Sequence, residues 1–274
     1  MEQYMKVLKR YTKNQYRLEA FIVKPIGLPQ THHYERRGGK GSQGYYVVTM
    51  GHEKLNQSHL YILNNTQEVL PYIVTHNYFF MATHPKSNMM KVLQEYNKIF
   101  INWFKETILG DDNASKTLKL LSMGPKLNVP TWKGCDINNF SFYTKSQNDK
   151  SRVQNSGVSL DVDSLHFSSA SNNNPICASI PYFGVIEEIW ELDYSKFIVP
   201  IFKCKWINGN TDVAYKDESF IVVEQAKQVF YVKDPYDSRW FVVLHGRTSG
   251  VNYQNVIQHL IIVRLILSPH TCLP

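Results

Sequence analysis

The sequence predicts an α+β fold in which a helix-containing N-terminal region is followed by a small antiparallel β barrel or a curled five-stranded sheet. Residues 182–247 hold five short runs of β-branched and aromatic residues, which are bounded by Gly, Asn, Asp and Pro as strands commonly are. Residues 87–109 instead carry a wide apolar stripe at helical spacing. Five strands with no helix between them favour a partly open barrel or a curled sheet.

The five predicted strands are Phe183–Leu192, Phe197–Ile207, Phe220–Glu224, Gln228–Lys233 and Trp240–His245. In the second strand Lys203 and Lys205 alternate with apolar residues, which predicts one buried face and one wet face. Pro200 lies inside this run and has no N–H, which indicates an edge strand or a bulge. Cys204 falls on the apolar face, so we interpret it as a core residue and not as a nucleophile.

Earlier elements are more mixed. The predicted helices are Met1–Lys13, a helix from Asn65 or Thr66 to His84, Ser87–Leu109 and Ser115–Ser122, and the predicted strands are Leu60–Leu63, Phe140–Thr144 and Val153–Phe167. The stretch Lys24–Gly51 contains the Gly-rich, basic run HHYERRGGKGS and is interpreted as a flexible loop-like arm.

These elements suggest five consecutive segments. They are the tail of a preceding domain (1–24), a mixed helical region with the basic arm (25–167), a polar linker (168–180), the small β module (181–247) and an aliphatic tail of different character (248–274). The linker is placed by the run SSASNNNP, which offers no packing residues.

Composition limits the classes of protein to be considered. Hydrophobic residues make up 43% of the chain, the net charge is +7 and the isoelectric point is about 9.0. Residues 1–60 carry ten basic and four acidic side chains, so a nucleic acid or another anionic surface is a plausible partner. The scattered cysteines form no CxxC pair, and no secretory signal or membrane-spanning run is recognised, so we expect a soluble intracellular protein with no membrane partner.

Catalytic and metal-binding patterns are weak. His32, His33, His52 and His59 lack the spacing of a zinc site and are interpreted as exposed loop residues. Asp161 and Asp163 could hold Mg²⁺ only if acids from separate elements converged on them. We therefore predict no enzyme activity, no cofactor and no small-molecule substrate.

Several blocks occur in the order seen in one protein family. They are MEQYMKVLKRYTKNQYRLEA, SHLYILNNTQEVLPYI, FINWFKETI, LLSMGP, QNSGVSL, PYFGVIEEIWELDY, VPIFKCKW, QAKQVFYVKD and RWFVVL. Over residues 1–247 the chain resembles proteins encoded by plant CACTA-class (En/Spm-like) DNA transposons, with a C-terminal transposase-associated domain of unknown function that follows the end of a second such domain.

The resemblance implies a nuclear, transposon-derived protein without the catalytic transposase domain, and it transfers no catalytic residue. The leading hypothesis is a non-catalytic accessory or binding module, or a degenerate fragment of one, whose partner is DNA or a transposase protein. The candidate nucleic-acid contacts are Arg36, Arg37, Lys40, Lys203 and Lys205. The alternatives are a metal-dependent nuclease remnant that uses Asp161 and Asp163, and a structural scaffold without a ligand.

Overall fold

A computed structural model describes residues 35–36, 40–83, 89–137, 139–150, 154–166, 176–207, 219–233 and 241–245. The chain divides into two compact units, and neither is continuous in sequence. The helical unit comprises residues 1–33, 53–125 and 161–180, and the β unit comprises residues 34–52, 126–160 and 181–274.

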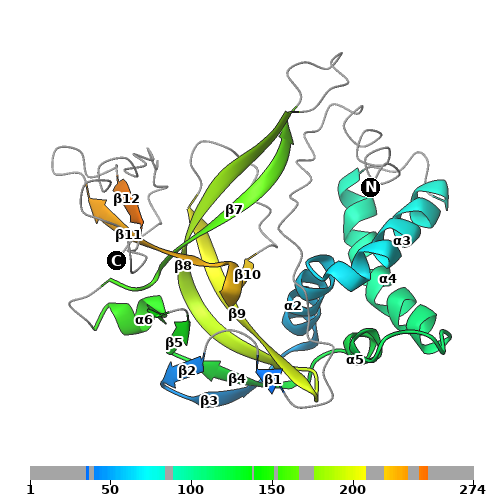
Figure 1. Cartoon of the computed structure of the whole chain (residues 1–274), viewed down its shortest axis with the longest axis horizontal. Coiled ribbons are helices and arrows are strands. Elements are labelled where there is room, and N and C mark those ends of the chain that lie inside the picture. Colours follow the sequence, from blue (N-terminus) through cyan, green and yellow to red (C-terminus); the bar gives the residue numbers. More distant parts are fainter. Residues whose placement is uncertain are drawn as a thin grey trace. The chain divides into compact units, whose positions relative to one another are not determined.

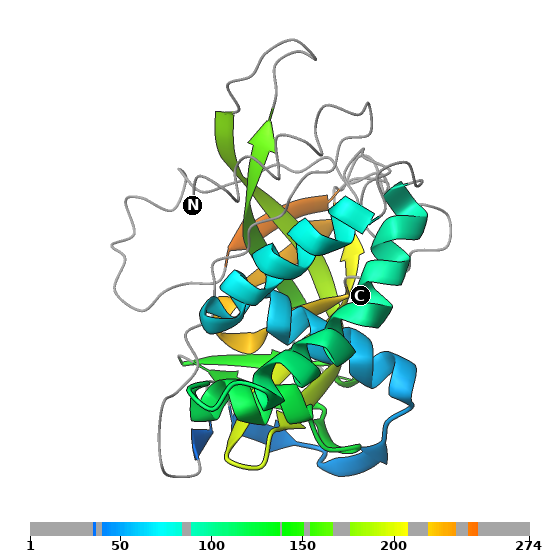
Figure 2. The same cartoon turned by 90° about the vertical axis from the view of Figure 1, so that its right-hand side faces the viewer.

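Four helices and one 3₁₀ turn are described between residues 52 and 123. They are α2 (His52–Asn64), η1 (Gln67–Val69), α3 (Leu70–Thr83), α4 (Met89–Leu109) and α5 (Lys116–Met123). The long helix α4 confirms the helix predicted from the apolar stripe, and Figure 2 shows it beside α3. Their apolar faces form a core of Ile62, Leu63, Val69, Phe80, Phe100, Phe104, Ile108, Leu118 and Leu121, all buried.

The ends of these helices follow local capping chemistry. The Ser115 hydroxyl accepts a hydrogen bond from the Leu118 N–H at 3.1 Å, so Ser115 caps the N-terminus of α5. The same hydroxyl donates to the Glu68 carboxylate at 2.7 Å, which ties η1 to the start of α5. The strand predicted at Leu60–Leu63 was wrong, because these residues complete the buried face of α2.

Twelve strands are described. They are β1 (Glu35–Arg36), β2 (Lys40–Gln43), β3 (Tyr46–Thr49), β4 (Asn128–Trp132), β5 (Gly134–Ile137), β6 (Phe140–Tyr143), β7 (Gly157–His166), β8 (Ile176–Asp193), β9 (Phe197–Ile207), β10 (Phe220–Val222), β11 (Lys227–Lys233) and β12 (Phe241–His245). A short helix α6 (Lys145–Asn148) and a 3₁₀ turn η2 (Val223–Gln225) complete the elements.

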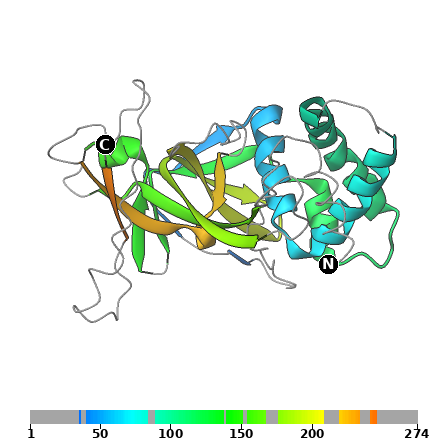
Figure 3. The same ribbon diagram turned by 90° about the horizontal axis from the view of Figure 1, so that it is seen from above.

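The larger sheet has nine strands, and β8 and β9 form its long curved antiparallel pair (Figures 1 and 3). Its main order is β1-β9-β8-β7-β11-β12, β10 also pairs with β9, and β3 and β4 extend from β8. A separate three-stranded sheet has the order β2-β5-β6.

The predicted α+β class is confirmed, but the predicted small barrel or five-stranded sheet was wrong. All five predicted strands exist, yet among the described residues the sheet is not a closed barrel, and β1, β3, β4 and β7 from the N-terminal region join it. Sequence proximity favoured pairing among consecutive strands, whereas β4 pairs with β8 and β11 pairs with β7 across long separations. Strand β8 also begins at Ile176, inside the stretch predicted as a linker.

Pro200 sets where the pairing between β9 and β10 stops. The Cys204 N–H donates a hydrogen bond to the Ser219 carbonyl, at the start of the pairing with β10. Backbone groups along an antiparallel strand alternate in direction, so the nitrogen of Pro200 also faces the β10 side. Because that nitrogen carries no hydrogen, β10 ends at Val222, one residue before it would face Pro200. Strand β9 is therefore internal, in contrast to the edge strand that Pro200 suggested, and the bulge lies on β8.

Residues 40–49 and 128–137 form one bent antiparallel ribbon, whose two halves enter different sheets. The bend occurs at Gly44, which has a φ of +64°, opposite Lys133, and a bulge between Gly41 and Gln43 adds to it. The Trp132 ring covers Gly41 so closely that a Cβ there would lie 2.0 Å from the indole. Part of the stretch predicted as a flexible arm is therefore β structure, and that prediction was wrong for β1, β2 and β3.

Three further predictions concern residues outside the described ranges. They are the helix Met1–Lys13, the polar run Ser168–Pro175 and the aliphatic tail 248–274.

Candidate functional site

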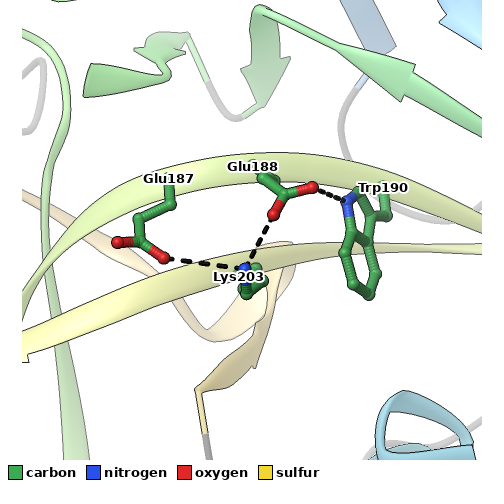
Figure 4. A network of polar contacts seen from close by, with 4 residues as sticks. All are labelled: Glu187, Glu188, Trp190 and Lys203. Atoms are coloured by element: carbon green, nitrogen blue, oxygen red, sulfur yellow. Dashed lines mark hydrogen bonds and ion pairs between the residues drawn. The ribbon is translucent and has the colours of Figure 1, made fainter. Parts of the chain in front are cut away.

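The candidate site begins on β8, where a bulge interrupts its pairing with β9. Ile186 pairs with Cys204, and the next pair joins Glu188 to Lys203. Glu187 is therefore the extra residue of the bulge. A bulge sets two consecutive residues opposite one residue of the neighbouring strand. Both glutamates consequently reach Lys203 (Figure 4).

Lys203 holds both carboxylates at once. Its Nζ lies 2.7 Å from Glu188 Oε1 and 3.7 Å from Glu187 Oε2. The second oxygen of Glu188 accepts a hydrogen bond from Trp190 Nε1 at 3.0 Å. Partial burial opposes the charge on Lys203, but the hydrogen bond and charge of Glu188, followed by those of Glu187, outweigh it and raise the pKa of Lys203. The Lys203 ammonium is therefore paired with carboxylates of its own sheet.

The same face of the sheet continues to β3. Trp190 pairs with Thr131 of β4, and Thr131 pairs with Tyr46 of β3. Burial raises the pKa of Tyr46, and the charge of Glu188 raises it further, so the phenol lies within electrostatic reach of that carboxylate. The polar cluster on β8 and β9 therefore extends toward β3.

Among the described residues, the structure does not gather Arg36, Lys40, Lys203 and Lys205 into one patch. Lys205 is exposed on β9, two residues from the ion-paired Lys203. Arg36 on β1 stands opposite Ile198, about 17 Å along β9 from Lys203 at the usual rise per residue. Lys40 is exposed on β2, in the other sheet, where it pairs with Asp136. Arg37 lies outside the described residues.

The carboxylates of the nuclease alternative lie on one strand. Asp161 and Asp163 both belong to β7, Asp161 is exposed, and the side chain of Asp163 is outside the described part. Within the described ranges, no three His, Cys, Asp or Glu side chains come together as a metal site would require.

Two buried groups that could supply nucleophilic or base chemistry are held in their neutral forms. Burial, together with the charge of Glu187, raises the pKa of the Cys204 thiol well above its usual value. Burial lowers the pKa of His59 to about 4. Cys204 is thus a core residue as predicted, whereas the interpretation of His59 as an exposed loop residue was wrong, because it is 2% exposed on α2.

Among the described strands of the β unit, β3 is notable for its exposed apolar side chains. The side chains of Tyr46 and Val47 are 44% and 51% exposed, and the adjoining Tyr45 is 59% exposed and contacts the Trp132 ring, with centroids 4.8 Å apart. Among the described strands, β3 pairs with β4 alone. Its register is regular over all four pairs, without a bulge. The strand thus presents an uncharged edge of the nine-stranded sheet.

The direction of the β3 backbone groups follows from one hydrogen bond. The Met50 N–H donates to the Leu127 carbonyl at 2.9 Å, in the same register as the β3–β4 pairs. Antiparallel bonds alternate, so Val48 bonds to β4, while Val47 and Thr49 direct their N–H and C=O groups to the opposite side. Pro130 faces Val47 across β4 and fits this pattern, because no N–H is needed at that pair.

Sequence reasoning missed β3 and the paired glutamates. The signal for β3 was present in the run Gly44–Met50, which contains only uncharged residues and is rich in aromatic and β-branched side chains. The adjacent Gly-rich basic run obscured it. Nothing in the sequence marks the bulge at Glu187, because it depends on the register of a distant strand.

Comparison with known proteins found no protein similar to this chain. No family model matches the chain, and neither the curated proteins nor the solved structures contain a match. None of the described helices is long and apolar enough to cross a membrane.

Proposed function

We propose that this chain is a non-catalytic accessory module of a CACTA-class transposon protein, and that its β unit binds a protein partner by adding an extended segment of that partner to β3. The family and its nuclear setting rest on the sequence blocks that resemble these proteins. The mode of binding rests on one observation, the regular, uncharged and exposed edge of β3.

Strand addition suits the chemistry of this edge. Main-chain hydrogen bonds supply affinity when an extended segment joins a sheet edge, and side chains on alternate positions supply specificity. Val47 and Thr49 offer the main-chain groups. Natural edge strands are commonly protected by charge, proline or a bulge, and β3 carries none of these. We therefore expect another polypeptide segment to cover this edge when the protein functions.

The neighbouring polar cluster favours a protein partner over nucleic acid at this face. The ammonium of Lys203 is committed to Glu188 and Glu187, which leaves two carboxyl groups for one amine. A phosphate brought to this position would meet those carboxyl groups. A polypeptide segment that adds to β3 instead needs only main-chain groups and apolar side chains.

A lysine-flanked peptide of alternating Thr and Val tests strand addition directly. We expect the labelled peptide to bind the full chain, as measured by fluorescence anisotropy, and to lose binding in Val47→Pro. Proline removes the outward N–H of Val47 and leaves the Val48 bond to β4 in place. Val47→Thr is the matched control, because it keeps both the N–H and the β-branched shape. Equal binding by Val47→Pro and the wild type contradicts the proposal.

A second candidate partner is duplex DNA, favoured by the net charge of +7 and by the exposed side chains of Lys40 and Lys205. Binding of this kind should weaken steeply as salt rises, because counterions are released from the duplex. Lys205→Ala should reduce the salt slope, while Lys203→Ala, which removes an ammonium engaged by Glu188, should change it less. No binding at low salt by a folded sample removes this candidate.

A further inference from the structure

We infer that the segment which covers β3 is β3 of a second copy of this chain, so that two copies join their nine-stranded sheets edge to edge about a two-fold axis. This inference rests on the proposed strand addition at β3 and names its occupant. Closed two-fold pairing uses the same surface on both copies, which requires an edge complementary to itself.

The hydrogen-bonding groups meet that requirement. Val47 lies at the centre of the exposed run and directs both its N–H and its C=O outward. An antiparallel second copy places its own Val47 directly opposite, and the two residues exchange both bonds as a hydrogen-bonded pair. Tyr45 and Thr49 have the same alternation as Val47, so Tyr45 of one copy faces Thr49 of the other. No outward N–H of the run faces another N–H, and no outward C=O faces another C=O.

The side chains of the run are also complementary to those of a second copy. In this register Tyr46 faces Val48 of the second copy, and Val47 faces Val47 of the second copy. Every cross-strand pair is aromatic with β-branched or β-branched with β-branched, and such pairs stabilise antiparallel strands. Like charges placed directly opposite destabilise a strand pair, and the run Gly44–Met50 contains no charged residue. The edge therefore carries no charge that would repel the same edge of a second copy.

The size of the contact sets the expected affinity. One short strand with Tyr45, Tyr46 and Val47 as its main exposed apolar side chains offers far less area than the ~1,600 Å² of a typical stable complex. The dimer should thus be weak and reversible. We expect sedimentation equilibrium to show mainly monomer at low concentration and a substantial dimer fraction by about 100 µM, since small interfaces bind weakly.

Charge substitution at Val47 gives a test specific to two-fold pairing, because position 47 faces itself. Val47→Lys places two ammonium groups opposite each other and should weaken dimerisation about tenfold or more, and Val47→Glu should do the same. Mixing the two variants should restore a one-to-one heterodimer. Val232→Lys, at a 47% exposed position on β11, is the control and should dimerise like the wild type.

The outcomes separate this inference from the proposed function. A wild-type chain that stays monomeric at about 100 µM, or Val47→Lys that dimerises unchanged, overturns the second copy as occupant. If the Thr–Val peptide still binds the monomeric chain, strand addition stands and the occupant is another protein. If neither the peptide nor a second copy binds, both proposals fail. A dimer that survives in Val47→Glu alone but not in the mixture also contradicts the two-fold register.

Discussion

A buried histidine of the helical unit and a partly buried lysine of the β unit keep opposite charge states. In the helical unit His59 is 2% exposed and remains neutral, because burial lowers its pKa to about 4. In the β unit Lys203 is partly buried yet keeps its charge, because Glu188 and Glu187 lie beside it. A helix presents its buried face to apolar neighbours, whereas a bulged strand can bring carboxylates to a cation on the adjacent strand. The two units should therefore respond differently to acid and to charge removal.

The largest effect is expected when the aromatic support of the charged cluster is removed. Trp190 is fully buried, contacts Phe220 and donates to Glu188. Trp190→Ala should lower the free energy of unfolding by about 3–5 kcal/mol, because it leaves a large cavity and an unsupported carboxylate. Urea denaturation measures the loss. Tyr45→Ala, at a 59% exposed position, is the control, and an equal loss there contradicts the assignment of Trp190 to the core.

Acid should act next most strongly, and it should act on the helical unit. His59 has a pKa of about 4 in the folded chain against 6.5 when unfolded, so protons bind the unfolded state preferentially. The stability from neutral His59 is fully present above pH 6.5 and is lost as the pH falls toward 4, by on the order of 3 kcal/mol.

Urea titrations between neutral pH and the acid limit measure this slope. His59→Leu should flatten it, whereas His52→Leu, at an exposed position on the same helix, should leave it unchanged. An unchanged slope in His59→Leu assigns the acid sensitivity to other groups, and His76 is the next candidate because burial also lowers its pKa.

Loss of the cation in the bulge should have a smaller effect. Lys203→Met leaves Glu187 and Glu188 adjacent without their ammonium and should cost about 1 kcal/mol, since the side chains are partly exposed. A double-mutant cycle with Glu188→Gln isolates the coupling between the two residues. Lys205→Met, on the same strand, should be nearly neutral. A coupling energy near zero in the cycle shows that the contact contributes no net stability.

The smallest effect is expected at the exposed ion pair between Lys126 and Asp193, which is 2.9 Å long. The Lys126 side chain is 57% exposed, so solvent screens the attraction. Lys126→Met should cost about 0.3 kcal/mol, and the difference should vanish at high salt. If Lys126→Met lowers the free energy of unfolding as much as Lys203→Met does, burial does not set the strength of these ion pairs.

Local pattern was sufficient for several elements. Along β9 the predicted wet face is exposed at Lys205 and only partly at Lys203. The apolar stripe of α4 and the short helix α5 were predicted from neighbouring residues and confirmed. Their common property is that the deciding interactions lie within a few turns or residues of one another. The nucleic-acid contacts, the partner and the transposon origin stay predictions.

Longer-range features were not predictable in this way. The run at Leu60–Leu63 has strand-like residues, but it is helical because α2 buries that face against its unit. Pro200 predicts an edge strand or a bulge in β9, yet β9 lies inside the sheet and β10 ends one residue before it would face Pro200. The free side of β3 depends on pairing with β4, which lies about 80 residues away in sequence.

The sequence by itself determined the α+β class and the helices α4 and α5, because hydrophobic periodicity is a local property. Tertiary structure alone decided that nine strands share one sheet, that Glu187 and Glu188 both meet Lys203, and that β3 presents its outer backbone groups. Each of these depends on the register between strands far apart in the chain. Register is set by which distant faces can be buried together, and a single residue of slip would reverse every side chain along the strand.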